Sequence, residues 1–155
     1  MRKRKPKKRV IAPDPRYGDA MVTQFVNNMM WEGKKSVSYG IFYDAMDKIE
    51  SRTSENPHDM WKKALENVMP AVEVRSKRIG GATFQIPTEI RPARRLSIGM
   101  KWLIRFSRAR SGKGMAEKLS AEIIAASKGE GASVKRREDT HRMAEANRAF
   151  AHFKA

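Results

Sequence analysis

The chain has 155 residues, the size of one domain, and its 33 Lys and Arg against 17 Asp and Glu give a net charge of +16. It has no cysteine, which excludes a disulfide framework and a thiolate metal site. No apolar run approaches the roughly 18 residues that a membrane span needs, and the basic N-terminus lacks the apolar region of a secretory signal. These facts favour a soluble protein with a polyanionic partner.

The positive charge is concentrated in two segments. Residues 1–16 hold eight Lys or Arg and one acid, for a net charge of +7, and residues 71–113 hold eleven and two, for +9. Residues 17–70 come to −2 and residues 114–155 to +2. Segregated charge of this kind predicts a nucleic-acid binder. A membrane surface is a weaker candidate, because neither basic segment carries a membrane-type apolar face.

The first basic segment, residues 1–16, is predicted to be a disordered tail, and residues 17–155 to form a single helical domain. Like charges repel one another along such a run while the chain is free, and phosphates can order it on binding. Its candidate contacts are Arg2, Lys3, Arg4, Lys5, Lys7, Lys8 and Arg9.

Apolar residues at helical spacing predict a first helix from Tyr17 to Trp31, ended by Gly33, and a second helix that Ser36 could cap. Lys34 and Lys35 lie in the turn between them, where phosphate contact and simple solvation are both open. The turn resembles a nucleotide-binding loop only faintly, because the first glycine and the preceding strand are missing, and that interpretation is rejected. The methionines of both helices are interpreted as core fillers.

A third helix is expected from Asn56, which precedes a proline at the first helical position, to Pro70. Residues 71–91 then alternate polar with β-branched or aromatic side chains on both sides of Gly80-Gly81. This pattern predicts a β-hairpin arm with a two-residue turn.

The expected pairing gives the arm a chemical face. If the two glycines form the whole loop, Lys77 pairs with Phe84 and Arg75 with Ile86, so that one face offers cations to phosphate and a ring to a base. An ordinary surface hairpin is the alternative. A lone two-stranded ribbon is marginally stable in water, which favours an arm that leans on a polyanion rather than on a protein core.

Pro92 is expected to begin a fourth helix, apolar nearly all round and therefore central, which residues 111–114 end. A fifth helix follows over residues 115–127. The last helix carries Lys135, Arg136 and Arg137 in its first turns, and because these cations oppose the helix dipole, an external anion is expected there. Its buried stripe is predicted to consist of Met143, Ala146, Phe150 and Phe153.

The predicted fold is therefore mainly α, a bundle of about six helices with one protruding β-hairpin arm between the third and fourth. No enzyme is expected. The histidines are scattered, no His and Glu pair has metal-ligand spacing, and no serine lies in a nucleophile elbow. No metal, cofactor or small-molecule substrate is predicted.

Two long stretches and several short ones resemble the bacterial-type family of small-subunit ribosomal protein seven. The long stretches are residues 64–87, which include Ala64-Leu65-Glu66-Asn67-Val68-Met69-Pro70 and Ile79-Gly80-Gly81-Ala82-Thr83-Phe84-Gln85-Ile86-Pro87, and residues 134–147. Shorter ones are Asp14-Pro15, Gly33-Lys34-Lys35-Ser36, Arg91-Pro92-Ala93-Arg94-Arg95 and residues 149–152.

The resemblance implies six helices with a β-ribbon between the third and fourth, in a cytoplasmic, ribosomal setting. It implies direct, early binding to the 3′ major domain of small-subunit ribosomal RNA, which nucleates assembly of the subunit head. It also implies a place in the wall of the exit site, near transfer RNA and messenger RNA, beside other head proteins and the platform protein eleven. No membrane partner is implied.

The leading hypothesis is a non-catalytic RNA scaffold, in which Arg94 and Arg95 make rigid contacts at the base of the arm. The alternative is an architectural DNA-binding protein with a basic β-arm, for which Ile79 is the only candidate wedge at the tip. Beyond the tail, the candidate RNA-binding residues are Lys34, Lys35, Arg75, Lys77, Arg78, Phe84, Arg91, Arg94, Arg95, Arg108, Arg110, Lys113, Lys135, Arg136, Arg137 and Arg142.

Overall fold

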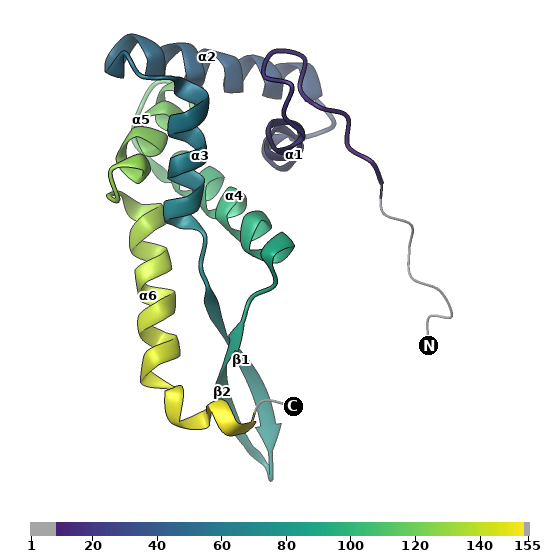
Figure 1. The fold of residues 1–155 in the computed structure, drawn as a ribbon, viewed down its shortest axis with the longest axis vertical. Helices are drawn as coiled ribbons and strands as arrows, with labels where there is room; N and C mark the ends of the chain where they lie inside the picture. Colours follow the sequence, from purple (N-terminus) through teal and green to yellow (C-terminus); the bar gives the residue numbers. More distant parts are fainter. Residues whose placement is uncertain (1–8, 154–155) are drawn as a thin grey trace.

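The computed structural model describes residues 9–153, which fold into helices and one hairpin (Figure 1). In chain order the elements are α1 (Ala20–Met29), α2 (Lys35–Thr53), α3 (Pro57–Val68), β1 (Val72–Ile79), β2 (Ala82–Glu89), α4 (Pro92–Ala109), α5 (Met115–Ser127), α6 (Ala132–Ala146) and the 3₁₀ helix η1 (Arg148–Phe153). The predicted mainly α fold, with its arm between the third and fourth helices, is confirmed.

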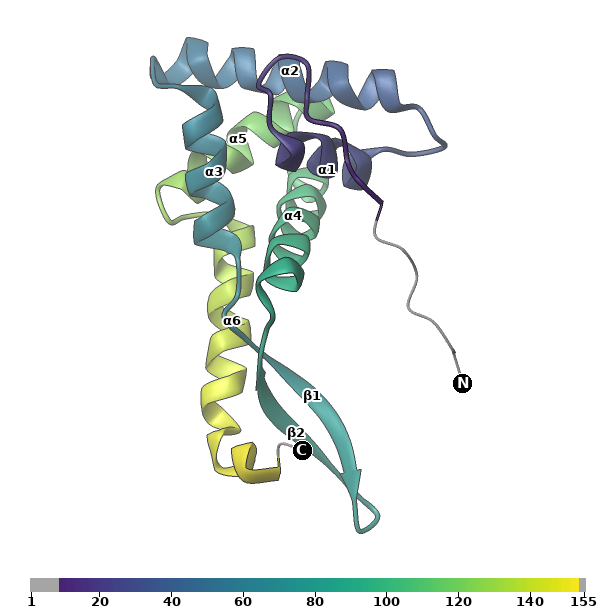
Figure 2. The same cartoon turned by 45° about the vertical axis from the view of Figure 1, so that its right-hand side comes forward.

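The helices form a body from which the hairpin projects. In both views α2 lies across one end, α4 and α6 run away from it, and the hairpin turn extends beyond the far end of α6 (Figures 1 and 2). The predicted central position of α4 is shared with α5: α4 contacts α1, α3, α5 and α6, and α5 contacts α2, α3, α4 and α6.

The main hydrophobic cluster of the described residues is built from the helices alone. The rings of Phe25, Phe42 and Trp61 contact one another, and the centroids of each pair are 5.6 Å apart. All three side chains are fully buried. Aromatic rings tilted or edge-on at this distance pack favourably beyond their buried area. Neither strand of the arm contributes to this cluster, so the arm lies outside the core.

Local chemistry explains where the helices begin. The Asn56 side chain accepts a hydrogen bond from the backbone N–H of His58, which confirms the predicted cap of α3. Asp19 accepts from Met21 in the same way, so α1 begins at Ala20 and not at Tyr17. The predicted Ser36 cap is wrong: α2 already begins at Lys35, without a side-chain cap.

The segment before α1 is attached to the body. Asp14 is buried, and its carboxylate accepts hydrogen bonds from the backbone N–H groups of Arg16 and Tyr17 and from the hydroxyl of Tyr43 on α2. Arg16 in turn pairs with Asp47. Residues 14–16, at the end of the predicted tail, therefore pack against α2.

The hairpin has the predicted register. Gly80 and Gly81 form the turn with φ of 56° and 89°, and Lys77 pairs with Phe84 as Arg75 does with Ile86. Directly opposed residues share a face, so one face carries these four side chains and the other carries Ser76, Arg78, Thr83 and Gln85.

The C-terminal end of the described chain differs from the prediction. α6 ends at Ala146, and residues 148–153 turn back as η1 to contact β2. Met143 is 41% exposed and Ala146 is exposed, so the predicted buried stripe through Phe153 is wrong. Phe150 and Phe153 instead lie against Phe84 of the arm, with ring centroids 5.3 and 5.5 Å away.

Candidate nucleic-acid interface

Within residues 9–153, a row of cations follows one face of α4. Arg94, Lys101, Arg105 and Arg108 are spaced by seven, four and three residues, which places them on one side of a helix. The first three are exposed and Arg108 is half-buried. We call this row the α4 basic stripe. It provides a line of positive charge on a rigid element.

Glu73 organises the base of the arm. Its carboxylate accepts hydrogen bonds from the guanidinium groups of both Arg75 and Arg94, at 2.8–3.1 Å. The hydrogen bond from Arg94 is the main cause that lowers the pKa of Glu73, against partial burial that works to raise it. Arg95 donates from Nε to the carbonyl of Pro70. The two arginines predicted to be rigid are thus both anchored within the chain.

The two faces of the arm differ in access. Phe84 is half-buried against η1, so the ring expected to meet a base is partly covered by the C-terminal segment of the described chain. Lys77, on the same face, donates to the backbone carbonyl of Phe153 but remains exposed. The expectation that the arm leans on a polyanion rather than on a protein core did not foresee this packing against η1, and binding of a polyanion by the arm stays a prediction. Arg78, on the other face near the turn, is exposed.

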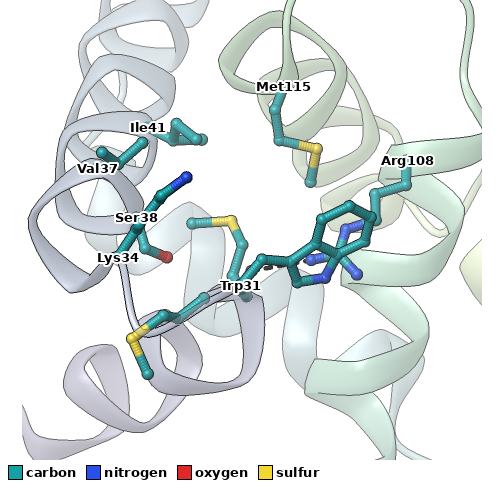
Figure 3. A pocket seen from close by; sticks show the side chains of 9 residues that line it. Trp31, Lys34, Val37, Ser38, Ile41, Arg108 and Met115 are labelled. Carbon is teal, nitrogen blue, oxygen red and sulfur yellow. Dashed lines mark hydrogen bonds between the residues drawn. The ribbon is translucent and has the colours of Figure 1, made fainter.

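A pocket lies between the end of α1, the start of α2, and the junction of α4 with α5. It has a volume of about 380 Å³ and an almost entirely apolar lining that includes Met30 and Met115. In Figure 3 the indole of Trp31 lies against Arg108, whose guanidinium carbon is 4.6 Å from the ring centroid. Arg108 also donates to the carbonyl of Met29, which fixes it at this rim.

Lys34 and Lys35, the cations predicted in the turn before α2, lie at that pocket and next to it in sequence. Lys34 lines it and pairs with Glu32 at 2.7 Å, and Lys35 lies 5.7 Å from the ring centroid of Tyr39. Both lysines are exposed, so these contacts are weak ones that a phosphate can replace.

The start of α6 brings a second group of cations beside α4. Lys135 and Arg136 are exposed, and the guanidinium carbon of Arg136 lies 5.7 Å from the ring centroid of Trp102 on α4. Arg137 is half-buried, 3.9 Å from Glu138. The buried carboxylate of Glu122 already lies at the N-terminal end of this helix, and the expectation that the cations here bind an external anion stays a prediction.

The remaining candidates are dispersed. Arg9, Arg91, Lys113 and Arg142 are exposed, with Arg142 3.5 Å from Asp139, and Arg110 pairs with Glu122. Residues Arg2 to Lys8 lie outside the described part of the chain. The structure therefore places candidates along α4, at the base of the arm and at the start of α6, and leaves Arg78 near the hairpin turn and Arg142 on the distal half of α6.

Sequence reasoning omitted several residues of this surface. Lys101 and Arg105 complete the α4 basic stripe, and their helical spacing from Arg94 and Arg108 was the signal that could have found them. The exposed ring of Trp31 and the role of Glu122 depend on contacts between elements, for which the local sequence gives no signal.

Other kinds of site find no support in residues 9–153. In this part of the chain no group of three or more His, Asp or Glu side chains could hold a metal ion. None of the helices described there is long and apolar enough to span a membrane.

A helical body with a basic helix face and a basic β-hairpin arm defines a class of small nucleic-acid-binding proteins that act by presenting charge on a rigid frame. Within that class, the sequence matches the model of the family described as Ribosomal protein S7p/S5e over residues 1–148. The chain belongs to this family, as the resemblance in its sequence indicated.

Curated relatives agree with this assignment. The chain is 62% identical over 154 residues to the small ribosomal subunit protein uS7 of Cytophaga hutchinsonii, and 59% identical over 157 residues to those of Flavobacterium psychrophilum and Porphyromonas gingivalis. Each match covers 99% of this chain and 99% of the relative. The chain is thus a structural protein of the small ribosomal subunit, located in the cytoplasm with the ribosome, and belongs to no enzyme family.

Proposed function

We propose that the chain binds the 3′ major domain of small-subunit ribosomal RNA directly and early, and so nucleates assembly of the subunit head. The observation that carries the proposal is the rigid arrangement of the α4 basic stripe, the base of the arm and the start of α6 on one helical frame. Charges held at fixed spacing can clamp phosphates of several RNA helices that meet at a junction.

Shape and backbone dominate this recognition. The major groove of A-form RNA is too deep and narrow for side chains to read, so cations on a fixed frame contact phosphates and ribose rather than base edges. The α4 basic stripe supplies the line of contacts, and Arg94 is held by Glu73 at its end nearest the arm.

The pocket beside Trp31 adds a place for an unpaired base. An exposed indole that already stacks with a guanidinium offers a surface on which a base can stack, and Lys34 and Lys35 stand nearby for the adjoining phosphates. Such a contact would favour RNA loops and bulges over a continuous duplex.

The arm extends the proposal to neighbours in the finished subunit. The turn of the hairpin projects beyond the helical body, and Arg78 near its tip is exposed (Figure 2). We assign this tip to the exit site, near transfer RNA and messenger RNA, and propose that the chain contacts other head proteins and the platform protein eleven.

An architectural DNA-binding protein is the competing function. Such arms insert an apolar wedge between base steps. Here the turn is Gly80-Gly81, and Ile79, the one apolar candidate at the tip, is half-buried. RNA is therefore the better partner on chemical grounds.

The test compares binding of the chain to a head-junction RNA fragment and to a DNA duplex of equal length across a salt titration. With six to ten phosphates engaged, affinity falls roughly 10³–10⁵-fold between 50 and 200 mM salt. The expected result is a clear preference for the junction RNA at every salt concentration. Equal binding to both would refute RNA-specific recognition.

A matched pair of variants locates the contact. Arg105→Gln on the α4 basic stripe is expected to reduce the salt slope by about one unit, as the removal of one phosphate contact requires. Lys48→Gln, an exposed lysine on α2, removes the same charge away from the stripe and should leave the slope unchanged.

A further inference from the structure

Glu122 is a charged side chain with no exposed surface. It lies on α5, where one carboxylate oxygen accepts hydrogen bonds from both the backbone N–H and the hydroxyl of Ser133, and the other accepts from Nε of Arg110. A buried carboxylate is costly unless it is paired and hydrogen-bonded. These three donors meet that condition, and they come from the end of α4 and the start of α6.

The start of α6 is shaped to receive this carboxylate. The residue before the helix is Gly131, with φ of 94° and no side chain to cap the first turn. A Cβ atom there would lie 3.1 Å from the Glu122 carboxylate oxygen and 3.3 Å from Cβ of Ala125. Glycine lets the helix start close against α5, and Glu122 takes the place of the missing cap.

The same carboxylate reduces the electrostatic repulsion at the start of α6. The first turn of α6 holds no acid, and Lys135 and Arg136 follow at once, so the positive end of the helix dipole faces like charges. A negative charge at that end offsets the positive end of the helix dipole and the charges of the two cations. Because Glu122 supplies it from inside the protein, the cations of α6 remain free for an outside anion.

Arg110 links this centre to the surface. It lies at the C-terminal end of α4, and its side chain is 35% exposed. A guanidinium has five N–H donors, and within residues 9–153 that of Arg110 donates one hydrogen bond, from Nε to Glu122. The donors that remain can bind phosphate while Glu122 holds the group in place.

We propose that Glu122 is a positioning residue for RNA binding. Its carboxylate fixes the end of α4 at Arg110 to the start of α6 at Ser133, so that the remaining donors of Arg110 and the cations that follow Ser133 on α6 are held at a constant spacing for phosphates. The inference rests on the proposed function, and it adds a residue that contacts no RNA itself.

The test uses Glu122→Gln with Glu117→Gln as its matched control. Glu117 lies on the same helix with its side chain 46% exposed, and both changes make the protein more positive by one charge. Net charge alone would strengthen RNA binding in both variants. We expect Glu117→Gln to bind junction RNA as well as the wild type or better. Glu122→Gln should bind it about five- to eightfold more weakly at 0.1 M salt for each phosphate that it no longer engages, with a lower salt slope.

Double-mutant cycles distinguish a positioning role of Glu122 from a general loss of structure. Combined with Lys135→Gln, the Glu122→Gln change should weaken binding by less than the two single effects together, because both changes remove the same contact. Combined with Arg78→Gln on the arm, the two effects should add. Additive effects in both pairs, or equal binding by Glu122→Gln and Glu117→Gln, would overturn the inference.

Folding and the parent proposal are checked separately. Circular dichroism and thermal unfolding establish the folded fraction, and if Glu122→Gln does not fold, Ser133→Ala carries the test because it removes one donor and keeps the carboxylate. Ser133→Ala is then expected to weaken binding in the same direction, and unchanged binding would overturn the inference. A wild type that shows no preference for junction RNA refutes the proposed function instead.

Discussion

Individual side chains at the base of the arm determine how it leaves the helical body. Glu73 binds Arg75 and Arg94 together, and the lowered pKa of Glu73 means that the folded state favours its ionised form. A group with a depressed pKa contributes stability above its unfolded value, and that contribution is lost as the pH falls through the folded one. The arm is therefore attached most firmly near neutral pH.

His141 adds a second attachment with its own pH dependence. Its Nε2 accepts a hydrogen bond from the backbone N–H of Ala71, 3.0 Å away, and joins α6 to the residue before β1. Burial lowers the pKa of His141, and the nearby cations Arg137 and Arg95 lower it further. Only the neutral ring can accept, so the contribution of this hydrogen bond to stability is complete above the unfolded pKa of about 6.5 and is lost as the pH falls through the lower folded pKa.

The His141→Gln variant tests this dependence. Its amide oxygen can still accept from Ala71 but does not titrate. Between pH 7.5 and 5, the melting temperature of the wild type should fall by about 2–4 °C more than that of the variant, the effect of roughly 1 kcal/mol in a chain of this size. His152→Gln, an exposed histidine, should behave as the wild type. Equal falls in all three proteins would exclude His141 as the cause.

At the scale of the element, the arm is a hairpin with one supported face. A two-stranded ribbon alone is marginally stable in water. Here Ile86 is buried, Phe84 packs against Phe150 and Phe153, and β1 and β2 both contact α6. The support leaves the opposite face, with Arg78, open to a partner.

The Phe153→Ala variant should loosen the arm without affecting the core. An aromatic pair contributes about 0.5–1.5 kcal/mol, so backbone amides of β2 around Phe84 should exchange their hydrogens about two- to tenfold faster. Met143→Ala, which trims an exposed side chain of α6, is the control and should leave exchange in β2 unchanged. Unaltered exchange in Phe153→Ala would show that η1 does not support the arm.

Elements governed by local chemistry could be predicted from the sequence. The Asn56 cap and the Gly80-Gly81 turn depend on neighbouring residues, and the structure has both where they were expected. The helical stripe predicted through Phe153 failed because helical periodicity was extended past Ala146, where the chain turns toward Phe84. That packing joins residues far apart in sequence, which a periodic pattern does not indicate.

The candidate site divides in the same way. The basic segments could be found by counting charges, since solvent-facing cations leave a signal in composition. Which of these cations pair with acids of the chain could not be found, because their partners are distant in sequence: Arg94 binds Glu73 at the base of the arm, and Glu122 joins Arg110 to Ser133. Only the fold brings those groups together.

At the scale of the whole molecule, the core and the arm are separate in packing. The main hydrophobic cluster of the described residues contains no side chain of β1 or β2, and Ile86 is buried apart from it. A shortened chain without residues 76–79 and 82–85 keeps the Arg75–Ile86 pair and the glycine turn. We expect its melting temperature to stay within about 4 °C of the wild type, since the helical core is intact.

The shortened chain should bind RNA less tightly nonetheless. It lacks Lys77 and Arg78, so its salt slope with junction RNA is expected to fall by up to about two units. Calorimetry and a salt titration measure stability and binding independently. Disappearance of the cooperative unfolding transition would show instead that the arm is part of the folding core.

The cover of the arm by η1 also has a consequence in time. Translation adds about 5–20 residues per second, and η1 lies some seventy residues downstream of the arm's turn, so it is made roughly 3–14 seconds later. During that interval a growing chain has its hairpin without the rings of Phe150 and Phe153. The ring of Phe84 is thus exposed while the polypeptide is being made. It is covered only after α6 and then η1 have been synthesised, so the hairpin forms before the segment that packs against it.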